Sequence, residues 1–379
     1  MSQEAQSPMT LLYTEVEEEL RAAVRGLLSG RSSPSEVLAH VESAASDGAV
    51  PYDLEVWKAL GRDIGAAGLL IPEDLGGAGA TAREAAVVLE ELGRAVAPVP
   101  YLSSAVLATR ALLGAEDEAA RDLLGRLASG EVTAALAVSF AASPYTPPLS
   151  AVTLGADGAL TGRVTGVIGA EVADVLIVPV AVEGSGSALY AVDASEARIK
   201  TVASLDLTRP IATVSFSGAQ GRPVGSAAGV GDALLLAAGL LASEQLGVAE
   251  WCLTTTVAYV KERKQFARPV GSFQAIKHRL ADLWLEIVGA RAAARNAAAL
   301  LGAGEDAHVA VAVAQAHCGV AAVHAAEECV QLHGGIGMTW EHPAHLYLKR
   351  AKADEIALGT PGDHREALAL MADLPGPVN

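Results

Sequence analysis

One helix-period pattern in the last third of the chain constrains the fold more than any other feature. A helix whose apolar residues recur at alternating steps of four and three presents them along one face, and that face needs neighbouring helices to cover it. The residues that follow this spacing are Ile276, Leu280, Leu283, Ile287, Ala290, Ala294, Ala297 and Leu301. We therefore expect one long helix here, packed in a bundle.

Two further apolar faces are expected to complete that bundle. A looser pattern runs from Leu234 to Tyr259, before the first helix. A third pattern follows it, formed by Val309, Val313, Ala316, Val320, Val323 and Val330. Because alanine at many of these positions lets helix axes approach closely, residues 225–379 are predicted to form a C-terminal four-helix bundle.

The first third of the chain is helical by its capping signals. Ser33-Pro34-Ser35-Glu36 has the residue types of a capping box with proline at the first helical position, and Thr81 to Glu84 repeats the box. Between them, the glycine-rich stretch from Ile71 to Gly79 is predicted to be an exposed, turn-rich loop. Residues 1–130 are thus expected to form an N-terminal helical domain.

In the middle third of the chain, the helix-period patterns give way to short runs typical of β-strands. Short β-branched runs bounded by Gly, Asp, Ser or Pro occur at 132–139, 160–165, 175–182, 189–192 and 211–216. No stretch between them is long enough for the helix of a parallel βαβ unit. Residues 131–224 are predicted to form an antiparallel β-barrel or sandwich, and the fold class is α+β, with helical, β and helical domains in that order.

The net charge and the cysteine pattern limit which partners and which cellular compartment we expect for this chain. The chain carries 44 acidic and 27 basic residues, a formal charge of −17, which argues against a nucleic-acid partner. Cys252, Cys318 and Cys329 show no CxxC spacing and are expected to be buried free thiols, with no disulfide and no metal site. The longest apolar run, residues 233–242, is too short to span a bilayer. We expect a soluble cytoplasmic protein with no membrane partner.

The segment Tyr259 to His278 is the first candidate binding site. Pro269 and Gly271 end a helix near Lys264, and Ser272 is expected to cap the next one. Such a corner exposes the side chains Arg263, Gln265 and Gln274 on one edge. The guanidinium offers a planar fork to a diphosphate, and the free amides at the following helix start favour an anion. From these residues alone, a solvated corner between bundle helices is favoured over a binding site.

The second candidate is the turn Gln331-Leu332-His333-Gly334-Gly335-Ile336-Gly337, which follows the third apolar pattern. Its adjacent glycines let the backbone approach a flat or charged ligand. A helix C-cap would use the same residues. The turn is neither a Walker loop, because no Gly-Lys-Ser/Thr follows, nor a Rossmann fingerprint, because no strand precedes it.

Taken together, these segments resemble the acyl-CoA dehydrogenase family over nearly the whole chain. The matching pieces are the Ile71 to Gly79 loop, Glu-Arg-Lys-Gln-Phe at 262–266, Phe-Gln-Ala at 273–275, the turn at 331–337 and Gly-Thr at 359–360. The resemblance implies FAD as cofactor, an acyl-CoA substrate and an electron-transfer flavoprotein as acceptor. It implies that FAD is held across a subunit interface by the following contacts: Arg263, Gln265, Phe266, Gln274, Gln331, Gly334 and Gly335.

The chain departs from this family where the chemistry takes place. The family's base is commonly a Glu directly before the terminal Gly-Thr, and here that residue is Leu358. In other members it lies on the first helix of the C-terminal domain, and here that position is Ala237. Glu244 is two helical turns away, roughly 11 Å, and we interpret it as polar packing or a helix–helix hydrogen bond. The catalytic residue therefore stays unassigned.

The flavin-facing residues of the family are also missing. Its Thr-Glu-Pro and Gly-Ser-Asp segment corresponds here to residues 138–144, and its Trp-x-Thr or Trp-x-Ser corresponds to Gly166-Val167-Ile168. Residues that hold the flavin ring in the same subunit are thus largely absent, while those that reach a neighbour's dinucleotide remain.

Three interpretations stay open. The chain could be the FAD-clasping partner subunit of a hetero-oligomer with a paralogous acyl-CoA dehydrogenase, as in some bacterial members of steroid side-chain breakdown. It could be a self-sufficient homo-oligomeric dehydrogenase for fatty-acid or steroid-type acyl groups, with a base not yet located. It could also be a non-enzymatic CoA-ester-binding or scaffold protein.

Overall fold

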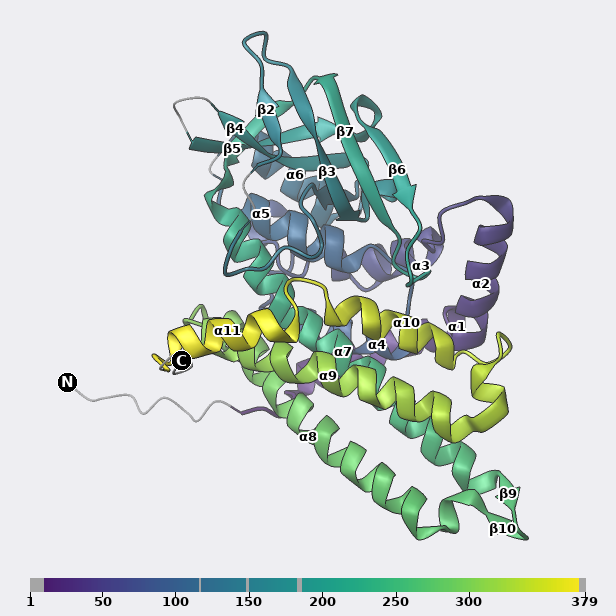
Figure 1. The fold of residues 1–379 in the computed structure, drawn as a ribbon. Coiled ribbons are helices and arrows are strands. Elements are labelled where there is room, and N and C mark those ends of the chain that lie inside the picture. Colours follow the sequence, from purple (N-terminus) through teal and green to yellow (C-terminus); the bar gives the residue numbers. More distant parts are fainter. Residues whose placement is uncertain (1–9, 116, 148–149, 183–185, 375–379) are drawn as a thin grey trace, which may run out of the picture.

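The chain folds into helices at both ends and a sheet in the middle. The computed structural model describes residues 10–115, 117–147, 150–182 and 186–374. Figure 1 shows the large sheet at one end of the molecule and the C-terminal helices, with a short hairpin at 264–269, at the other. The N-terminal helices α4 (Ala82–Ala95) and α5 (Thr109–Leu113) lie close to α7 (Val230–Glu262). The predicted fold class, helical then β then helical, is confirmed.

The N-terminal part is a set of short helices whose starts agree with the sequence. The capping boxes at Ser33 and Thr81 are both formed, and the loop from Ile71 to Gly79 contains only one 3-10 turn. The elements are α1 (Glu15–Arg31), α2 (Pro34–Asp47), α3 (Leu54–Lys58), α4 (Ala82–Ala95), the π-helical η4 (Tyr101–Ala108), α5 (Thr109–Leu113) and α6 (Glu118–Ala128).

The sheet has the strand order β6-β7-β3-β2-β4-β5-β8, and β1 pairs with β4. Its strands are β1 (Ala134–Leu136), β2 (Val152–Leu154), β3 (Leu160–Ile168), β4 (Val175–Val182), β5 (Gly186–Asp193), β6 (Arg198–Val202), β7 (Ile211–Ala219) and β8 (Arg222–Ser226). The prediction of a wholly antiparallel sheet is wrong, since β1 and β2 both run parallel to β4. The chain between β1 and β4 is long enough to cross over, and it does so through β2 and β3 instead of a helix.

The C-terminal bundle consists of α7 (Val230–Glu262), α8 (Gln274–Ala303), α9 (His308–His333), α10 (Ala344–Glu355) and α11 (Pro361–Met371). The apolar face predicted on α8 is confirmed: Leu283, Ile287, Ala290, Ala294 and Ala297 are buried. By composition two stretches, 227–262 and 308–338, could cross a membrane, yet 72% and 67% of their most apolar windows are buried inside the protein. They are core helices of this bundle.

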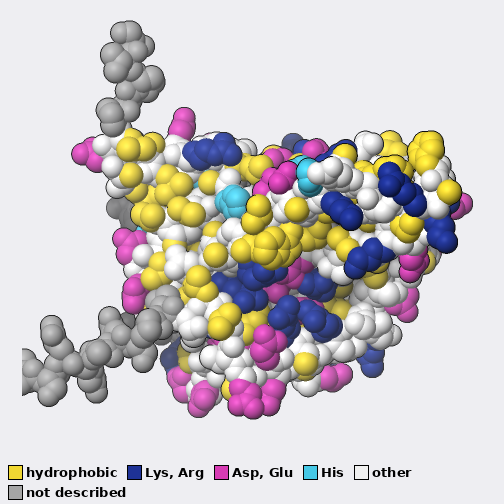
Figure 2. Space-filling model, turned by 90° about the horizontal axis from the view of Figure 1, so that it is seen from below, with side chains coloured by type: hydrophobic (Ala, Val, Ile, Leu, Met, Phe, Trp, Pro, Cys, Tyr) yellow, Lys and Arg dark blue, Asp and Glu magenta, His cyan; other side chains and the backbone are white. Residues whose placement is uncertain are grey.

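The face predicted for α9 is wrong at three of its six positions; Val323 is buried and Val330 is half-buried, as expected. Val309, Val313 and Val320 are exposed, and the buried face carries smaller residues instead, among them Ala314, Cys318, Ala322, Ala325 and Cys329. Both faces of α9 are apolar, so period alone cannot decide which one meets the core. Figure 2 views the molecule from below and shows hydrophobic side chains gathered over much of the face seen in that view.

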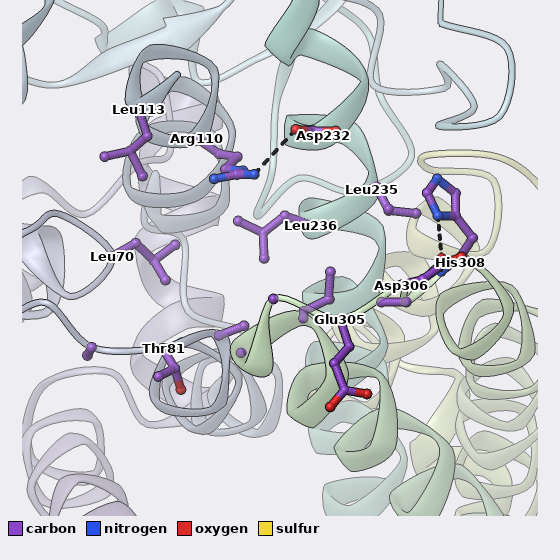
Figure 3. Close-up of a pocket in the computed structure, with 16 residues that line it drawn as sticks. Leu70, Thr81, Arg110, Leu113, Asp232, Leu235, Leu236, Glu305, Asp306 and His308 are labelled. Carbon is purple, nitrogen blue, oxygen red and sulfur yellow. Dashed lines mark hydrogen bonds and ion pairs between the residues drawn. The ribbon is translucent and has the colours of Figure 1, made fainter. Parts of the chain in front are cut away.

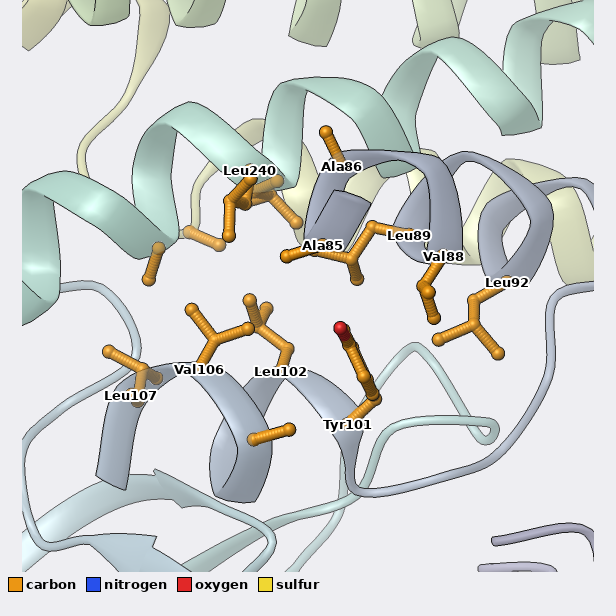
Figure 4. Close-up of a cluster of buried hydrophobic side chains, with 14 of the residues drawn as sticks. Ala85, Ala86, Val88, Leu89, Leu92, Tyr101, Leu102, Val106, Leu107 and Leu240 are labelled. Carbon is orange, nitrogen blue, oxygen red and sulfur yellow. The ribbon is translucent and has the colours of Figure 1, made fainter. Parts of the chain in front are cut away.

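The core between the N-terminal helices and α7 is closely packed. Figure 4 shows the apolar side chains of α4 facing Tyr101, Leu102 and Val106 of η4, with Leu240 of α7 beside them. Two glycines let α4 and α7 cross at backbone contact: a Cβ at Gly93 would lie 2.1 Å from the carbonyl oxygen of Glu244, and one at Gly247 would lie 1.9 Å from that of Glu90. No side chain fits at either position.

We predict that Gly247→Ala lowers the free energy of unfolding by about 1–3 kcal/mol, because the added methyl group must push two helix backbones apart. The matched control is Gly26→Ala on the exposed face of α1, where no atom lies within 4 Å of the new Cβ. That control should stabilise the protein by about 0.5–1 kcal/mol through helix propensity. Urea unfolding of both variants measures the difference, and equal stabilities would contradict the close crossing.

Candidate functional site

The corner after α7 is a short hairpin, not a direct helix-to-helix turn. The two-residue strands β9 (Lys264–Gln265) and β10 (Arg268–Pro269) pair, and a 3-10 turn at Val270–Ser272 leads into α8. The prediction that Ser272 caps α8 is wrong, because the extended Phe273 is the capping residue. The Ser272 hydroxyl instead donates to the carbonyl of Pro269 at 2.7 Å.

The hairpin turn holds two side-chain-bearing residues in the left-handed region. Phe266 has a φ of 53° and Ala267 a φ of 63°. A two-residue hairpin with both central residues at positive φ normally uses Asn or Gly, so this backbone is strained. The strain presents the Phe266 ring to solvent with 87% of its surface exposed, in edge contact with Phe273.

The glycine turn follows the end of α9 and is open. Gly334 adopts φ 62° and ψ −137°, and its N–H donates to the carbonyl of Gln331. A residue with a Cβ would be strained in this conformation. No atom lies within 4 Å of a Cβ built on Gly334 or Gly335, so a ligand could approach this backbone closely.

These two segments line one cavity of about 480 Å³. Of the predicted cofactor contacts, Arg263, Gln265, Gly334 and Gly335 line it, together with Tyr259, Val270, Leu332, His333 and Ile336. Three predicted contacts do not line it. Phe266 points into solvent, Gln274 lies on the first turn of α8 beside His278, and Gln331 is exposed on α9.

The cavity has the charge and shape of an anion site. Among the described residues, the Arg263 guanidinium has no carboxylate partner, although the chain as a whole is strongly acidic. Lys264 and Arg268 add positive charge on the same hairpin. A free guanidinium beside an open glycine backbone fits the pyrophosphate of a dinucleotide. The residues present therefore fit the dinucleotide end of FAD.

Sequence reasoning included Tyr259 and His333 in the two candidate segments but did not name them as cofactor contacts. Their rings stack at 4.4 Å between centroids, and His333 also lies 4.4 Å from the ring of His342. Tyr259 precedes Arg263 by one helical turn and His333 directly precedes Gly334, so their spacing to the predicted contacts was a usable signal.

The segments in which the chain departs from the family, around Phe140, Gly166 and Leu358, lie together outside this cavity and are hydrogen-bonded to one another. The N–H of Phe140 donates to the carbonyl of Gly166 at 2.8 Å, and the N–H of Leu358 donates to the carbonyl of Phe140 at 2.7 Å. His364 Nε2 donates to the Leu358 carbonyl at 3.1 Å. Leu358 and Ala237 are fully buried. The Leu358 N–H, which could otherwise polarise a thioester carbonyl, is already occupied.

Glu244 belongs to a buried ionic network that joins the sheet to the bundle. The segment before β7 contributes Asp206 and Arg209, α7 contributes Glu244, and α10 contributes Arg350 and Asp354. Arg350 Nε contacts Asp206 Oδ2 at 2.5 Å, and Arg209 contacts Asp354 Oδ1 at 2.6 Å. Both arginines also bind Glu244 Oε1. The interpretation of Glu244 as a polar packing residue is confirmed.

A larger cavity of about 550 Å³ lies between α4, α5, α7 and the α8–α9 connection. Figure 3 shows its leucine lining, including Leu70, Leu113 and Leu236, with an ion pair and a hydrogen bond at its edge. The Arg110–Asp232 pair spans 3.3 Å and the His308–Asp306 pair 2.8 Å, and all four side chains are exposed. Within the described part of the chain, no cluster of His, Cys, Asp and Glu could hold a metal ion.

Comparison with known proteins matches both helical parts of the chain. The model of the acyl-CoA dehydrogenase N-terminal domain matches residues 14–131, and that of the C-terminal domain matches residues 230–370. Acyl-CoA dehydrogenase IpdE2 of Mycolicibacterium smegmatis is 37% identical over 359 residues, which cover 94% of this chain and 98% of that protein. IpdE2 of Mycobacterium tuberculosis is also 37% identical, over 90% of this chain and 92% of its own length.

The fold is likewise similar to solved complexes. The structure of the ChsE4-ChsE5 complex from Mycobacterium tuberculosis contains a chain that superposes with a TM-score of 0.85 at 29% identity, covering 97% of this chain and all of that one. A variant of the steroid ACAD Tcur3481-Tcur3483 gives a TM-score of 0.82 at 28% identity, with 96% of this chain and 99% of that one covered.

The ionic network generates a prediction about pH. Three carboxyl groups face two guanidinium groups, and burial raises the pKa of Asp354 to about 8, while Arg209 opposes the rise and Glu244 adds to it. An unfolded aspartate titrates near pH 3.9, so unfolding between about pH 4 and 8 releases this proton. Stability should therefore fall as the pH rises through that window, with a slope of up to about 1.4 kcal/mol per pH unit.

Asp354→Asn should remove this contribution to the slope, because the amide does not titrate. Asp282→Asn, an exposed position on α8, is the control and should leave the slope unchanged. Thermal unfolding at several pH values measures both. An identical slope in Asp354→Asn and the parent chain would contradict a protonated Asp354.

Proposed function

Because the chain belongs to the acyl-CoA dehydrogenase family, whose members are FAD-dependent oxidoreductases, we propose that it acts in the α,β-desaturation of an acyl-CoA thioester as the FAD-clasping subunit of a hetero-oligomer. One observation carries this proposal. The cavity that fits the dinucleotide end of FAD is open, while the positions of the family's catalytic base are apolar and sealed inside the protein.

The residues of the open cavity would hold the cofactor and would not take part in proton transfer. Arg263 would bind the pyrophosphate through its planar fork, and the backbone at Gly334 and Gly335 would approach it without steric hindrance. Gln265 would contribute a side-chain amide from the hairpin. The bound FAD supplies the hydride acceptor for desaturation.

Neither of the family's two base positions offers a group that could remove the substrate's α-proton, and the nearby Glu244 is held in the ionic network. A general base must come within hydrogen-bond reach of that proton. Leu358 and Ala237 cannot accept one, and Glu244 is committed to Arg209 and Arg350. The base would therefore come from a paralogous subunit, whose own flavin ring and acyl-CoA site this chain completes from outside.

The rim of the cavity supports closure by another subunit. The exposed side chains around it include Phe266 on the hairpin and Ile336 and Met338 after the glycine turn. The bundle surface adds Trp284 and Leu285 of α8. Apolar side chains gathered around a polar cavity are typical of a protein–protein interface.

The comparisons support the type of partner and substrate. ChsE4-ChsE5 is described as a complex, and Tcur3481-Tcur3483 carries two components in its name and is called a steroid ACAD. We infer a steroid-type acyl-CoA as the substrate class, a paralogous dehydrogenase as the partner, and an electron-transfer flavoprotein in the cytoplasm as the electron acceptor. A homo-oligomer closed by the same apolar rim is the second arrangement that the structure accommodates.

We predict that Arg263→Ala weakens FAD binding by the assembly about 10- to 100-fold, the loss expected for charge-assisted hydrogen bonds to a phosphate. Arg263→Lys keeps the charge without the fork and should give an intermediate loss. Arg126→Ala, in an exposed ion pair with Glu131, is the surface control. Flavin absorbance after dialysis measures retention, and unchanged flavin content in Arg263→Ala would refute the assignment of this cavity.

We also predict that the purified chain alone desaturates acyl-CoA esters at a rate lower than the hetero-oligomer by at least a factor on the order of 10²–10⁴, the usual cost of losing a general base. In the hetero-oligomer, replacing the partner's base with Gln should abolish turnover. Leu358→Glu should lower the melting temperature and restore no activity, because the new carboxylate would be buried without a partner. Efficient turnover by the chain alone would refute this division of labour and favour the homo-oligomer.

A further inference from the structure

His333 occupies an unusual position at the base of the open cavity. It is the last residue of α9, only 3% of its surface is exposed, and it still lines the cavity beside Gly334. Its ring is held between two others: Tyr259 of α7, tilted by 27°, and His342, tilted by 43°, each 4.4 Å away. The imidazole therefore has one fixed orientation.

The contacts of the ring determine where its protons lie. Nδ1 is 2.7 Å from the carbonyl oxygen of Cys329 and 3.6 Å from the Cys329 sulfur. A carbonyl oxygen only accepts, so Nδ1 must carry a hydrogen in every protonation state. Nε2 has no hydrogen-bond partner among the described residues, and it is not one of the fully enclosed side-chain atoms. A second proton on the ring would thus sit on Nε2.

We propose that His333 is a positioning residue for the dinucleotide: its imidazolium places an Nε2–H donor and a second positive charge beside Arg263, toward the pyrophosphate of FAD. This inference rests on the proposed function, because it concerns the same cavity. It adds a titratable cation to a site otherwise built from a permanently charged guanidinium and backbone groups, so cofactor retention becomes dependent on pH.

The surroundings of the ring favour the charged form. Burial lowers the pKa of His333, but its hydrogen bonds to the Cys329 side chain and carbonyl outweigh burial and raise it above the ordinary value. The pKa of the Cys329 thiol falls to about 5, through hydrogen bonding from Cys252 first and, against the effect of burial, from His333 and Thr256. A thiolate at Cys329 would pair with the imidazolium.

The remaining titratable groups around the ring do not compete with it for the proton. Burial, and then the nearby charge of His333, lower the pKa of His342, so this neighbour stays neutral while His333 is charged. On α7, Cys252 has its pKa raised by burial and stays protonated. Tyr259 of α7 stacks on the ring, and Arg263, the residue that caps α7, lines the same cavity.

The direction of the pH dependence follows from linkage. The pyrophosphate diester of FAD keeps its negative charge throughout the neutral range, so only the protein titrates. Binding favours the protonated imidazole and must raise its pKa further. Affinity is therefore greatest below the pKa of His333 and declines as the pH rises through it.

The test measures FAD binding by the intact oligomer between pH 6 and 8.5, with ADP-ribose as a second probe that carries the same pyrophosphate diester. His333→Asn is the informative variant, because its amide nitrogen can replace Nδ1 as donor to the Cys329 carbonyl while no charge is possible. His342→Asn is the matched control on the neighbouring ring. Histidine side-chain NMR of the parent protein gives an independent reading that needs no substitution.

The parent should lose about tenfold in FAD affinity across this range, the effect of one charge-assisted hydrogen bond in a cavity open to solvent. His333→Asn should be about tenfold weaker at pH 6 and independent of pH, and His342→Asn should behave like the parent. ADP-ribose should raise the pKa of the His333 resonance.

Two results would overturn the inference in distinguishable ways. Affinity that is independent of pH in the parent and equal in His333→Asn, with binding still lost in Arg263→Ala, refutes the role of His333 and leaves the proposed function intact. An ADP-ribose-insensitive His333 resonance would refute it in the same way. Absence of FAD and ADP-ribose binding by the parent oligomer at pH 6 refutes both.

Discussion

The relative position of sheet and bundle depends on five ionisable side chains that are buried together, four of them charged and Asp354 protonated at neutral pH. Asp206, Arg209, Glu244, Arg350 and Asp354 come from three parts of the chain and meet where the sheet region contacts α7 and α10. Removing such charges from water costs several kcal/mol each, and their mutual attraction offsets this only in good geometry. The network is thus a poor source of net stability, but it specifies one relative position of sheet and bundle.

The relative position of sheet and bundle determines which of two sites is accessible to a ligand: the region around Leu358 or the cavity at Arg263. The Arg209 guanidinium lies 5.6 Å from the Phe140 ring, and Phe140 in turn holds Leu358 through its carbonyl. The network therefore contacts the segment around Phe140, which is hydrogen-bonded to Gly166 and to Leu358. These are the segments in which the chain departs from the family. At the other end of α7, roughly 28 Å along the helix from Glu244, the cavity at Arg263 has no such neighbour. The middle of α7 is thus buried in the ionic network, while its C-terminal end borders the open cavity.

The sequence predicts most of what depends on local period and on contiguous motifs. The α8 face and the capping boxes at Ser33 and Thr81 follow from residues close in sequence. The grouping of Arg263 with the distant glycine turn follows instead from the family resemblance. The cavity residues Tyr259 and His333 were within reach of the same reasoning, because each lies within one of the two candidate segments.

Other features could not be read from the sequence for physical reasons. Both faces of α9 are apolar, so its orientation depends on the fit of alanine and cysteine against α7, which period does not encode. The parallel pairing of β1 with β4 depends on a crossover made from strands. The partners of Glu244 lie far away in sequence, and an isolated buried glutamate shows no pattern that identifies them. Domain boundaries at 130 and 224, and the individual cofactor contacts, stay predictions.

The loop at Leu358 and Gly359 has an unusual backbone conformation at the position of the family's catalytic base. Leu358 has a φ of 55° and Gly359 a φ of 98°, so a leucine holds a left-handed conformation inside the protein. This backbone costs on the order of 1–3 kcal/mol and persists only where its surroundings determine it, here by hydrogen bonds at both its N–H and its carbonyl. The Leu358 side chain is buried in the interior, where it fills space and offers no proton acceptor. The chain thus retains the backbone of a catalytic loop without its proton acceptor, which is the structure expected of a subunit that completes another subunit's site.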